Sequence, residues 1–486
     1  MKEVIRKYIS KNLDDNFNYI KKLMQDNSDI VYRDINFKGT KLTLIYIDGM
    51  ASKDLLNNYI IEPLVKFDKN NESEFQDIES FITASDFKAF NDLEVAINMM
   101  LSGDTILLVD GKEEVNVIAT RSWPNRGVSE PRGESGLRGP LDGFTETVRF
   151  NTALIRRRIR DTRLVVKSKS IGVRSKTDCA IMYIDDIVNP DIVTEVNKRL
   201  DDIHIDAILD SGYIEQLIED NKFSIFPQIQ STERPDVVAG ALYEGRVAII
   251  IDNSPYALIV PTIFANFFQS ADDYYLSFLQ GMYSRVLRYL SVFLTTMLPA
   301  LYISITTYNS SIIPSKLAYS IAEARATVPF PSLVETLIME ISLQLVVEAI
   351  LRTPKIISST IGIVGGLIIG QAAVTAGIVS PFMIIIISIT TLTSLTTPNI
   401  SLNTTYRYIR LAMIFASYFM GLYGILVVFI VVLLHLSNLK SFGVSYLAPL
   451  NTFRTNDFKD YIFRTPLHKM RKRPEIMNTL DKYRQK

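Results

Sequence analysis

The chain is poor in the residues that hold metals and disulfides. It has one cysteine, Cys179, and three histidines among 486 residues. A single thiol excludes an internal disulfide, and scattered histidines do not form a cysteine- or histidine-rich metal site. The sequence also lacks a G-x-x-x-x-G-K-[ST] phosphate loop and an H-E-x-x-H zinc motif, which are signatures of two large enzyme classes. We therefore expect a protein that is not an enzyme and that uses no metal or cofactor.

An excess of charge of either sign is also missing. The 52 Lys and Arg residues balance 52 Asp and Glu residues, so no general attraction to nucleic acid follows. The polar N-terminus lacks the apolar core of about 7–15 residues that a secretory signal needs. We expect the N-terminal region to be cytosolic and to bind no nucleic acid.

Long apolar runs are present, and they are confined to the second half of the chain. The four strongest cover residues 286–308, 356–379, 381–397 and 408–436, and a helix needs roughly 20 apolar residues to cross a bilayer. We predict a polytopic α-helical membrane domain over 269–440. Basic residues near 469–473 indicate that the tail, 441–486, is cytosolic too, so an even number of spans is expected.

The first half contains a weak internal repeat. Segments that begin at Leu42 and Cys179 both show an apolar strand ending in Ile-Asp, a turn and an amphipathic helix. Segments that begin at Gly103 and Gly245 both show a strand, a polar turn and a second strand. The sequence therefore predicts two related α/β subdomains, over 1–125 and 165–268. Residues 247–268 resemble a membrane span in hydropathy, but the repeat favours a buried hairpin there.

The linker between the subdomains, 126–164, is basic. From Arg121 to Lys176 there are 14 Lys or Arg against 5 Asp or Glu. Apolar residues at helical spacing predict a helix over 145–160, with arginines in a parallel stripe. The helix either docks on anionic lipid or an acidic partner, or is a solvated face with ordinary ion pairs. The candidate interface residues are Arg138, Arg149, Arg156, Arg157, Arg158 and Arg160.

A polar stripe marks the predicted helix over 331–351. Glu340, Gln344 and Glu348 recur every four residues, and Glu348 can pair with Arg352 one turn later. Carboxylates within apolar sequence usually face a cavity, a pore or a partner helix. The alternative is an amphipathic helix that lies on the membrane surface with its acids in water.

Small residues dominate the run over 356–379. Gly362, Gly366 and Gly370 form two consecutive G-x-x-x-G steps, which allow close approach of helices in lipid. The run is either a packed structural helix or one that lines an oligomeric pore. The candidate pore or gate residues of the chain are Glu340, Gln344, Glu348, Thr360, Gly362, Gly366, Gly370 and Gln371.

Several longer motifs resemble one family over nearly the whole chain beyond about residue 40. They are Glu130-Pro131, Arg138-Gly139-Pro140, Gly143-Phe144-Thr145-Glu146, Asn151, Ala153-Leu154-Ile155-Arg156-Arg157-Arg158-Ile159, Asp273-Tyr274-Tyr275, Leu298-Pro299-Ala300-Leu301-Tyr302 and the glycine-rich run from Ile363 to Val374. On these residues the chain resembles the A subunits of GerA-type spore germinant receptors, including the related SpoVAF proteins. One departure is Leu343-Gln344 and Val347-Glu348-Ala349, where the family usually has Phe-Glu and Arg-Glu-Ala.

The resemblance implies a multi-pass protein of the spore inner membrane that acts in germination. It implies a transporter-like B subunit and a lipoprotein C subunit as partners, contact with membrane lipid, and a homo-oligomer that forms a nutrient-gated channel for monovalent cations. Two alternatives are a non-conducting scaffold for the B and C subunits and a SpoVAF-like accessory protein. A secondary transporter is disfavoured, because the membrane half shows no inverted repeat.

Overall fold

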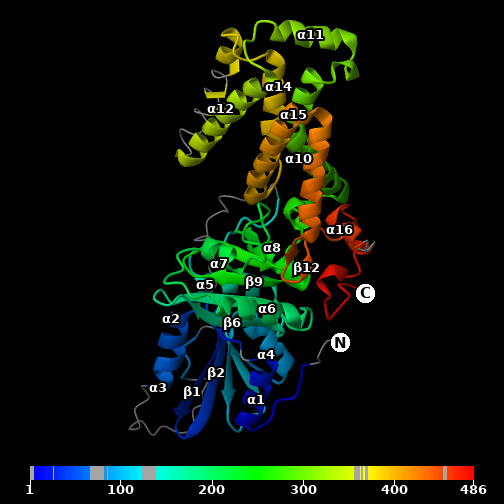
Figure 1. Ribbon diagram of the computed structural model, residues 1–486. Helices are drawn as coiled ribbons and strands as arrows, with labels where there is room; N and C mark the ends of the chain where they lie inside the picture. Colours follow the sequence, from blue (N-terminus) through cyan, green and yellow to red (C-terminus); the bar gives the residue numbers. More distant parts are fainter. Residues whose placement is uncertain are drawn as a thin grey trace.

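The computed structural model describes residues 5–25, 27–65, 81–84, 86–122, 138–354, 362, 365–366, 370–452 and 457–485. Figure 1 shows three parts along one axis: a first subdomain that contains β1 (Ile30–Phe37), a second that contains β6 (Leu164–Ile171), and a group of long helices. The predicted fold class, two related α/β subdomains followed by a helical region, is confirmed. Thr360 is the one candidate site residue that lies outside the described residues.

The first subdomain is an antiparallel sheet with helices on both faces. Its strands pair in the order β1-β2-β4-β5-β3. One face packs against α1 (Leu13–Leu23) and α4 (Leu93–Met100), and the other against α2 (Lys53–Leu56), η1 (Asn57–Ile61) and α3 (Glu62–Val65). The strands are β1 (Ile30–Phe37), β2 (Thr40–Ile47), β3 (Phe87–Phe90), β4 (Thr105–Val109) and β5 (Val115–Ile118).

The second subdomain repeats this topology, with strands in the order β6-β7-β9-β10-β8. Alternate strand residues face α5 (Val148–Arg158) and α8 (Pro235–Tyr243), and the others face α6 (Pro190–Asp201) and α7 (Ser211–Ile218). This period of two buries both faces of the sheet. The strands are β6 (Leu164–Ile171), β7 (Thr177–Ile184), β8 (Gln230–Thr232), β9 (Val247–Ile251) and β10 (Ala257–Val260).

Two expectations for the first half can be compared with these elements. The apolar stretch that begins at Val247 is a buried antiparallel hairpin, β9 paired with β10, as the repeat predicts. The linker helix is shorter than predicted: α5 begins at Val148, where Asp252 accepts a hydrogen bond from the Val148 amide at 2.9 Å, and it ends at Arg158. Arg160 therefore lies beyond the helix, and the predicted arginine stripe stops one turn early.

The helical half begins with a short helix, α9 (Asp272–Tyr275), and then a long one, α10 (Phe278–Thr307). Phe278–Thr307 and Ser401–Asn438 are long and apolar enough to cross a membrane among the described residues, where four such runs were predicted. Helix α14 (Pro381–Ser394) has 14 residues and is too short alone, and most of 356–369 lies outside the described part. Between α10 and α14 lie α11 (Ser315–Arg325) and α12 (Ser332–Arg352).

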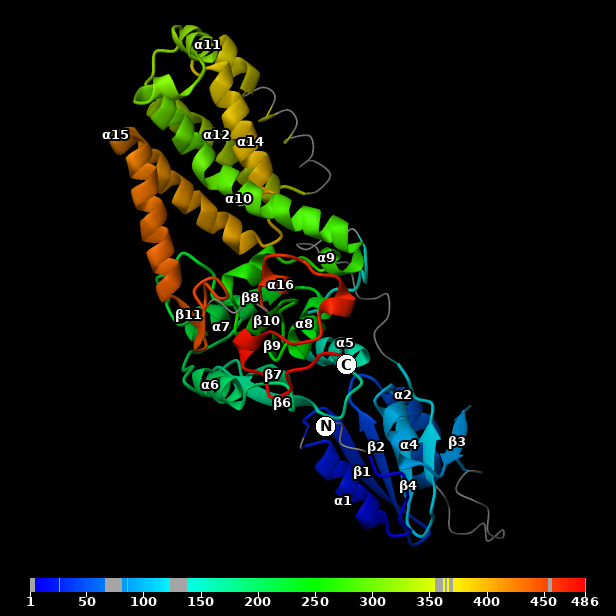
Figure 2. The same ribbon diagram turned by 90° about the vertical axis from the view of Figure 1, so that its right-hand side faces the viewer.

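The last long helix, α15 (Ile400–Asn438), is bent sharply. Gly421 has φ 61° and ψ −143°, which interrupts the helix. Figures 1 and 2 show the two arms of α15 as a V whose open ends point toward the second subdomain. The Tyr308 hydroxyl donates to the Tyr418 carbonyl at 2.6 Å and so packs α10 against the bend.

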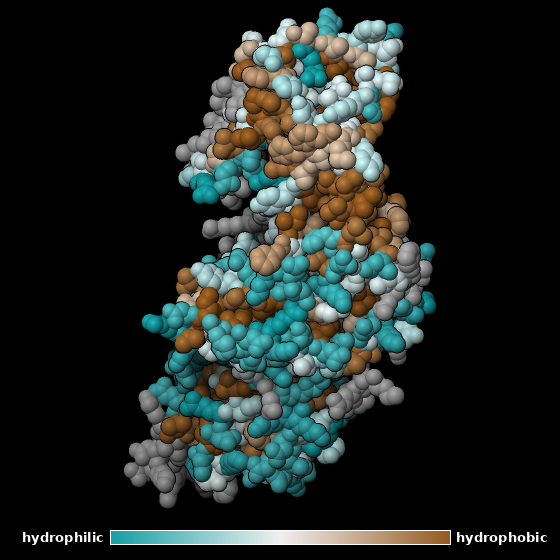
Figure 3. Space-filling model, viewed as in Figure 1, coloured by the Kyte–Doolittle hydropathy of each residue, from teal (hydrophilic) through white to brown (hydrophobic). Residues whose placement is uncertain are grey.

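The C-terminal segment returns to the second subdomain. A small hairpin, β11 (Lys440–Ser441) with β12 (Val444–Ser445), lies against it: Tyr446 donates to the Pro227 carbonyl at 2.6 Å, and Ser441 donates to the Gln228 carbonyl at 2.8 Å. Helix α16 (Phe458–Tyr461) follows. Figure 3 shows mostly hydrophilic side chains over the two subdomains and a larger share of hydrophobic ones over the helices.

Candidate functional site

Helix α12 carries the predicted polar stripe of the helical half. Glu340 is buried, Gln344 is half-buried, and 47% of the Glu348 side chain is exposed. The predicted stripe therefore runs from the packed interior to the surface, and its members do not share one site. Glu348 accepts a hydrogen bond from Arg352 at 2.7 Å, which confirms the predicted i,i+4 pair.

Glu340 is paired within the chain. Its carboxylate accepts a hydrogen bond from Arg410 on the first arm of α15, and both side chains are 8% exposed. Arg410 also donates to the Thr295 carbonyl of α10 at 3.3 Å. This group of contacts ties three helices together through a buried ion pair. Removing either partner would leave an uncompensated buried charge.

A second buried carboxylate, Glu335, holds the start of α14. It accepts hydrogen bonds from the Ser380 amide at 2.6 Å and from the Ser380 hydroxyl at 2.5 Å, and it is fully buried. Arg325 of α11 lies 3.7 Å from its other oxygen. A carboxylate beside the N-terminus of a helix is favourable because it faces unpaired amides. Glu335 therefore joins α11, α12 and α14.

The three glycines of the predicted packing face have different surroundings. A Cβ at Gly362 would lie 3.2 Å from Ile350 of α12, and one at Gly370 would lie 4.0 Å from Ile384 of α14. A Cβ at Gly366 would meet nothing within 4 Å. Gln371 is exposed. Gly362 and Gly370 thus pack inside the chain, while Gly366 and Gln371 face outward.

The basic linker residues have different surroundings, and several of them form ion pairs within the chain. Arg156 is 1% exposed and is bonded to Asp29 of the first subdomain, and Arg158 pairs with Asp142 at 2.6 Å. Arg149 lies 3.8 Å from Asp48. Arg157 and Arg160 are exposed, and Arg138 sits beside α9, where its amide donates to Asp272 at 3.2 Å. Arg156 therefore joins the two subdomains and is not available to lipid.

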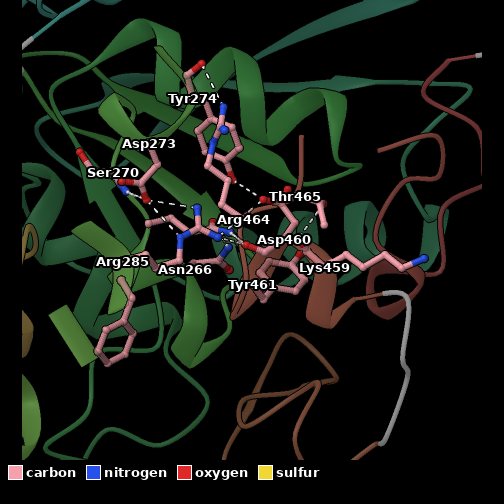
Figure 4. A network of polar contacts seen from close by, with 12 residues as sticks. Asn266, Ser270, Asp273, Tyr274, Arg285, Lys459, Asp460, Tyr461, Arg464 and Thr465 are labelled. Carbon is pink, nitrogen blue, oxygen red and sulfur yellow. Dashed lines mark hydrogen bonds and ion pairs between the residues drawn. The ribbon is translucent and has the colours of Figure 1, made fainter. Parts of the chain in front are cut away.

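The first long helix is anchored to the tail by a buried polar network (Figure 4). Arg285 of α10 is fully buried and lies 3.1 Å from Asp273, while Arg288 lies 2.8 Å from the same carboxylate. The Tyr274 hydroxyl donates to Asp460 of α16 at 2.8 Å. Burial, with help from Asp460, raises the pKa of Tyr274 well above its usual value, so the hydroxyl keeps its proton. The network connects α9, α10 and the tail.

Sequence reasoning missed three charged residues of the helical half. Arg410 is a charge within an otherwise apolar run, and such a residue signals a buried partner. Glu335 shares α12 with the predicted stripe but lies off its spacing, and Arg325 precedes the helix. The partner of Glu340 is 70 residues away in the sequence, so helical spacing alone does not reveal it.

Comparison with known proteins identifies the family. The model of the Bacillus/Clostridium GerA spore germination protein family matches residues 18–476. The chain is 40% identical to spore germination protein KA of Bacillus subtilis over 98% of this chain and 89% of the relative, and 40% identical to B. subtilis spore germination protein B1 over 98% and 100%. It is 38% identical to the B. subtilis membrane protein YfkQ over 96% and 91%.

A solved structure is also similar. It is the N-terminal domain of the A subunit of the Bacillus megaterium spore germinant receptor GerK3, with a TM-score of 0.42, 34% identity, and coverage of 54% of this chain and 99% of that one. The family match over most of the chain agrees with the resemblance found in the motifs. This family consists of membrane-associated receptor subunits and not of enzymes. The chain belongs to the GerA family of spore germination proteins.

Proposed function

We propose that this chain is the A subunit of a nutrient germinant receptor in the spore inner membrane, and that several copies form a channel that releases monovalent cations. It would act with a transporter-like B subunit and a lipoprotein C subunit. Both termini would face the spore interior. Nutrient binding by the complex would open the channel.

The half-exposed charge of Glu348 carries the proposal. Glu340 and Glu335 are buried and paired inside the chain. Glu348 is paired only with Arg352 at the surface, and 47% of its side chain stays exposed. A closed ring of chains would turn one such carboxylate per chain into a ring of carboxylates. Rings of Asp or Glu select cations. The outward-facing Gly366 and Gln371 support contact between chains on the neighbouring segment.

A scaffold is the second candidate, and the polar network around Arg285 favours it. The network binds α9, α10 and the tail into one unit, which suits a rigid platform for the B and C subunits. In this case the chain conducts nothing. Substitutions in the cytosolic half would then prevent assembly with the B and C subunits. Substitutions at Glu348 would leave assembly unchanged.

Cation flux from liposomes tests the two functions. The full chain is reconstituted with B and C subunits, K+ release is followed on addition of candidate nutrients, and wild type is compared with Glu348→Gln. Glu323→Gln is the matched control, because Glu323 is exposed on α11. The channel proposal predicts at least a several-fold loss of flux for Glu348→Gln alone, with the complex intact. Equal flux in all three proteins would contradict the role of Glu348, and absence of flux from an intact complex would favour the scaffold.

A further inference from the structure

A large cavity lies where the second subdomain, the helical half and the tail meet. Its volume is about 880 Å3. The walls come from α8, from the tail at Arg473 and Arg484, and from the segment 395–403, which contains the connection between α14 and α15 and the start of α15. Cavities of about 300–1,000 Å3 are typical of small-molecule sites. The position is unusual because three separate parts of the chain each supply a wall.

The charge of the cavity wall is positive. Four arginines line it, from both the second subdomain and the tail, against two carboxylates among the described lining residues. Arg234 pairs with Asp236 at 2.8 Å, and Arg484 pairs with Glu244 at 3.0 Å. These two pairs account for both carboxylates.

The other two arginines, Arg246 and Arg473, have weaker compensation. Arg246 is buried and donates to the Pro261 carbonyl at 2.8 Å and to the Thr262 hydroxyl at 2.9 Å, and neither acceptor is charged. Arg473 donates to the Tyr243 carbonyl at 2.7 Å and pairs at 3.4 Å with Asp481, which lies outside the wall. Arg246 is therefore the wall arginine without an ion pair among the described residues, and it leaves the wall with an excess of positive charge that favours an anion.

Polar atoms without partners also occur in residues that line the cavity. The side-chain oxygens of Gln230 and Asn403 and the Nε atoms of Arg473 and Arg484 are buried and make no hydrogen bond, and all four residues line the cavity. The Arg473 side chain is only 9% exposed. Buried polar groups are normally paired, so two unused donors and two unused acceptors in one cavity indicate a polar ligand.

We propose that this cavity binds a phosphate-bearing anion, either the headgroup of an anionic lipid or a soluble phosphate ester. Arginine side chains bind phosphate oxygens through several directed donors, and Arg473 and Arg484 place two such side chains in the wall. The cavity lies at the C-terminal end of α14 and the N-terminal end of α15. A lipid headgroup would therefore reach the cavity at the end of the apolar helices. A bound anion would bridge α8, the 395–403 segment and the tail. This proposal does not depend on whether the chain conducts ions.

Gly240 offers a way to block the cavity without removing charge. It lies inside α8, lines the cavity, and a Cβ there would meet nothing within 4 Å. Gly240→Met should fill the space with a flexible side chain, and it also replaces glycine by a better helix former. Gly240→Ala is the matched control, since one methyl group leaves most of the volume free. Arg473→Gln removes one donor, and Arg471→Gln is its control, because Arg471 is exposed and lies outside the cavity.

The test uses the full chain in nanodiscs with two phosphate sources. Native mass spectrometry counts phosphatidylglycerol retained from mixed phosphatidylcholine discs, and calorimetry in pure phosphatidylcholine discs measures binding of glycerol 3-phosphate. We expect one saturable site for at least one probe, with binding weakened tenfold or more by Gly240→Met and by Arg473→Gln but not by the two controls. Retention of the lipid alone would assign a headgroup, and binding of the soluble ester would assign a free phosphate. Binding of neither probe, or equal binding by Gly240→Met and Gly240→Ala in folded protein, would overturn the proposal.

Discussion

Asp29 and Arg156 form a buried ion pair between the two subdomains, with the Arg156 Nη2 atom 2.8 Å from the Asp29 Oδ1 atom and each side chain 1% exposed. Asp29 immediately precedes β1, and Arg156 belongs to α5, which packs on the second sheet. The pair is therefore a structural joint between the repeats. It also explains why an arginine-rich helix is only partly exposed.

We predict that breaking this joint destabilises the protein strongly. Arg156→Met or Asp29→Leu leaves one buried charge without its partner, which costs about 3–5 kcal/mol. The double change Asp29→Leu with Arg156→Met should be much milder than the sum, because no lone charge remains. Unfolding in denaturant, followed by a probe in the cytosolic half, measures all three. Arg174→Met is the control, since its ion pair with Asp206 is exposed and worth less than about 1 kcal/mol. If the double variant were destabilised by the sum of the two single effects, Asp29 and Arg156 would not act as a pair.

The bend in α15 should require glycine. Gly421 has a positive φ and an extended ψ, a combination that costs other residues about 1–3 kcal/mol. A Cβ there would lie no closer than 3.4 Å to Tyr308, so the penalty comes from the backbone and not from a clash. Gly421→Ala should lower the melting temperature, whereas Gly240→Ala, inside α8, should keep or raise it. If both changes shifted the melting temperature equally, the bend in α15 would not require glycine at position 421.

Gly366 should tolerate a large side chain in the isolated chain but not in an oligomer. A Cβ at this position meets nothing within 4 Å, so Gly366→Leu is expected to leave the stability of the detergent-solubilised monomer within about 0.5 kcal/mol. If copies pack through this face, the same change should reduce the oligomer. Size-exclusion chromatography with light scattering measures both species. If Gly366→Leu left the fraction of oligomer unchanged, Gly366 would not lie in the contact between chains.

Glu215 should make the second subdomain less stable at alkaline pH. Burial in α7, together with Glu219 and Asp210, raises the pKa of its carboxyl from 4.5 to about 7. The folded state then binds the proton more tightly than the unfolded state, so stability is full below pH 4.5 and falls as the pH rises through 7. Glu215→Gln should stabilise the protein by about 1–2 kcal/mol at pH 8 and have little effect at pH 4.

Melting temperatures across pH 4–8 check this prediction. Glu113→Gln is the control, because 67% of the Glu113 side chain is exposed. A Glu215→Gln effect that is constant across the pH range would contradict the raised pKa.

The repeat in the first half was predictable because strand-turn patterns are local. The Ile-Asp turns after β2 and β7, and the hairpin of β9 and β10, follow from alternation and turn residues within about 20 positions. The same strand order in both sheets follows from repeating those pieces. The start of α5 was not predicted, because the Asp252 side chain that caps it is 104 residues away from Val148.

The candidate site was predicted less well, for the same physical reason. The Glu348–Arg352 pair lies within one turn, and spacing finds it. The partner of Glu340 is on α15, and the partner of Glu335 is Ser380 at the start of α14. Pairing across helices depends on how they pack, which sequence periodicity does not specify. The cavity near Arg473 depends on the tail folding back, which carries no local signal.

The most direct test of the channel is the ion selectivity of the purified chain in a planar bilayer with unequal KCl on the two sides. The proposal predicts single-channel currents whose reversal potential lies near the potassium equilibrium value, and a shift of that potential toward zero for Glu348→Gln. Currents that are absent from a correctly assembled oligomer, or a reversal potential near the chloride value, would contradict it.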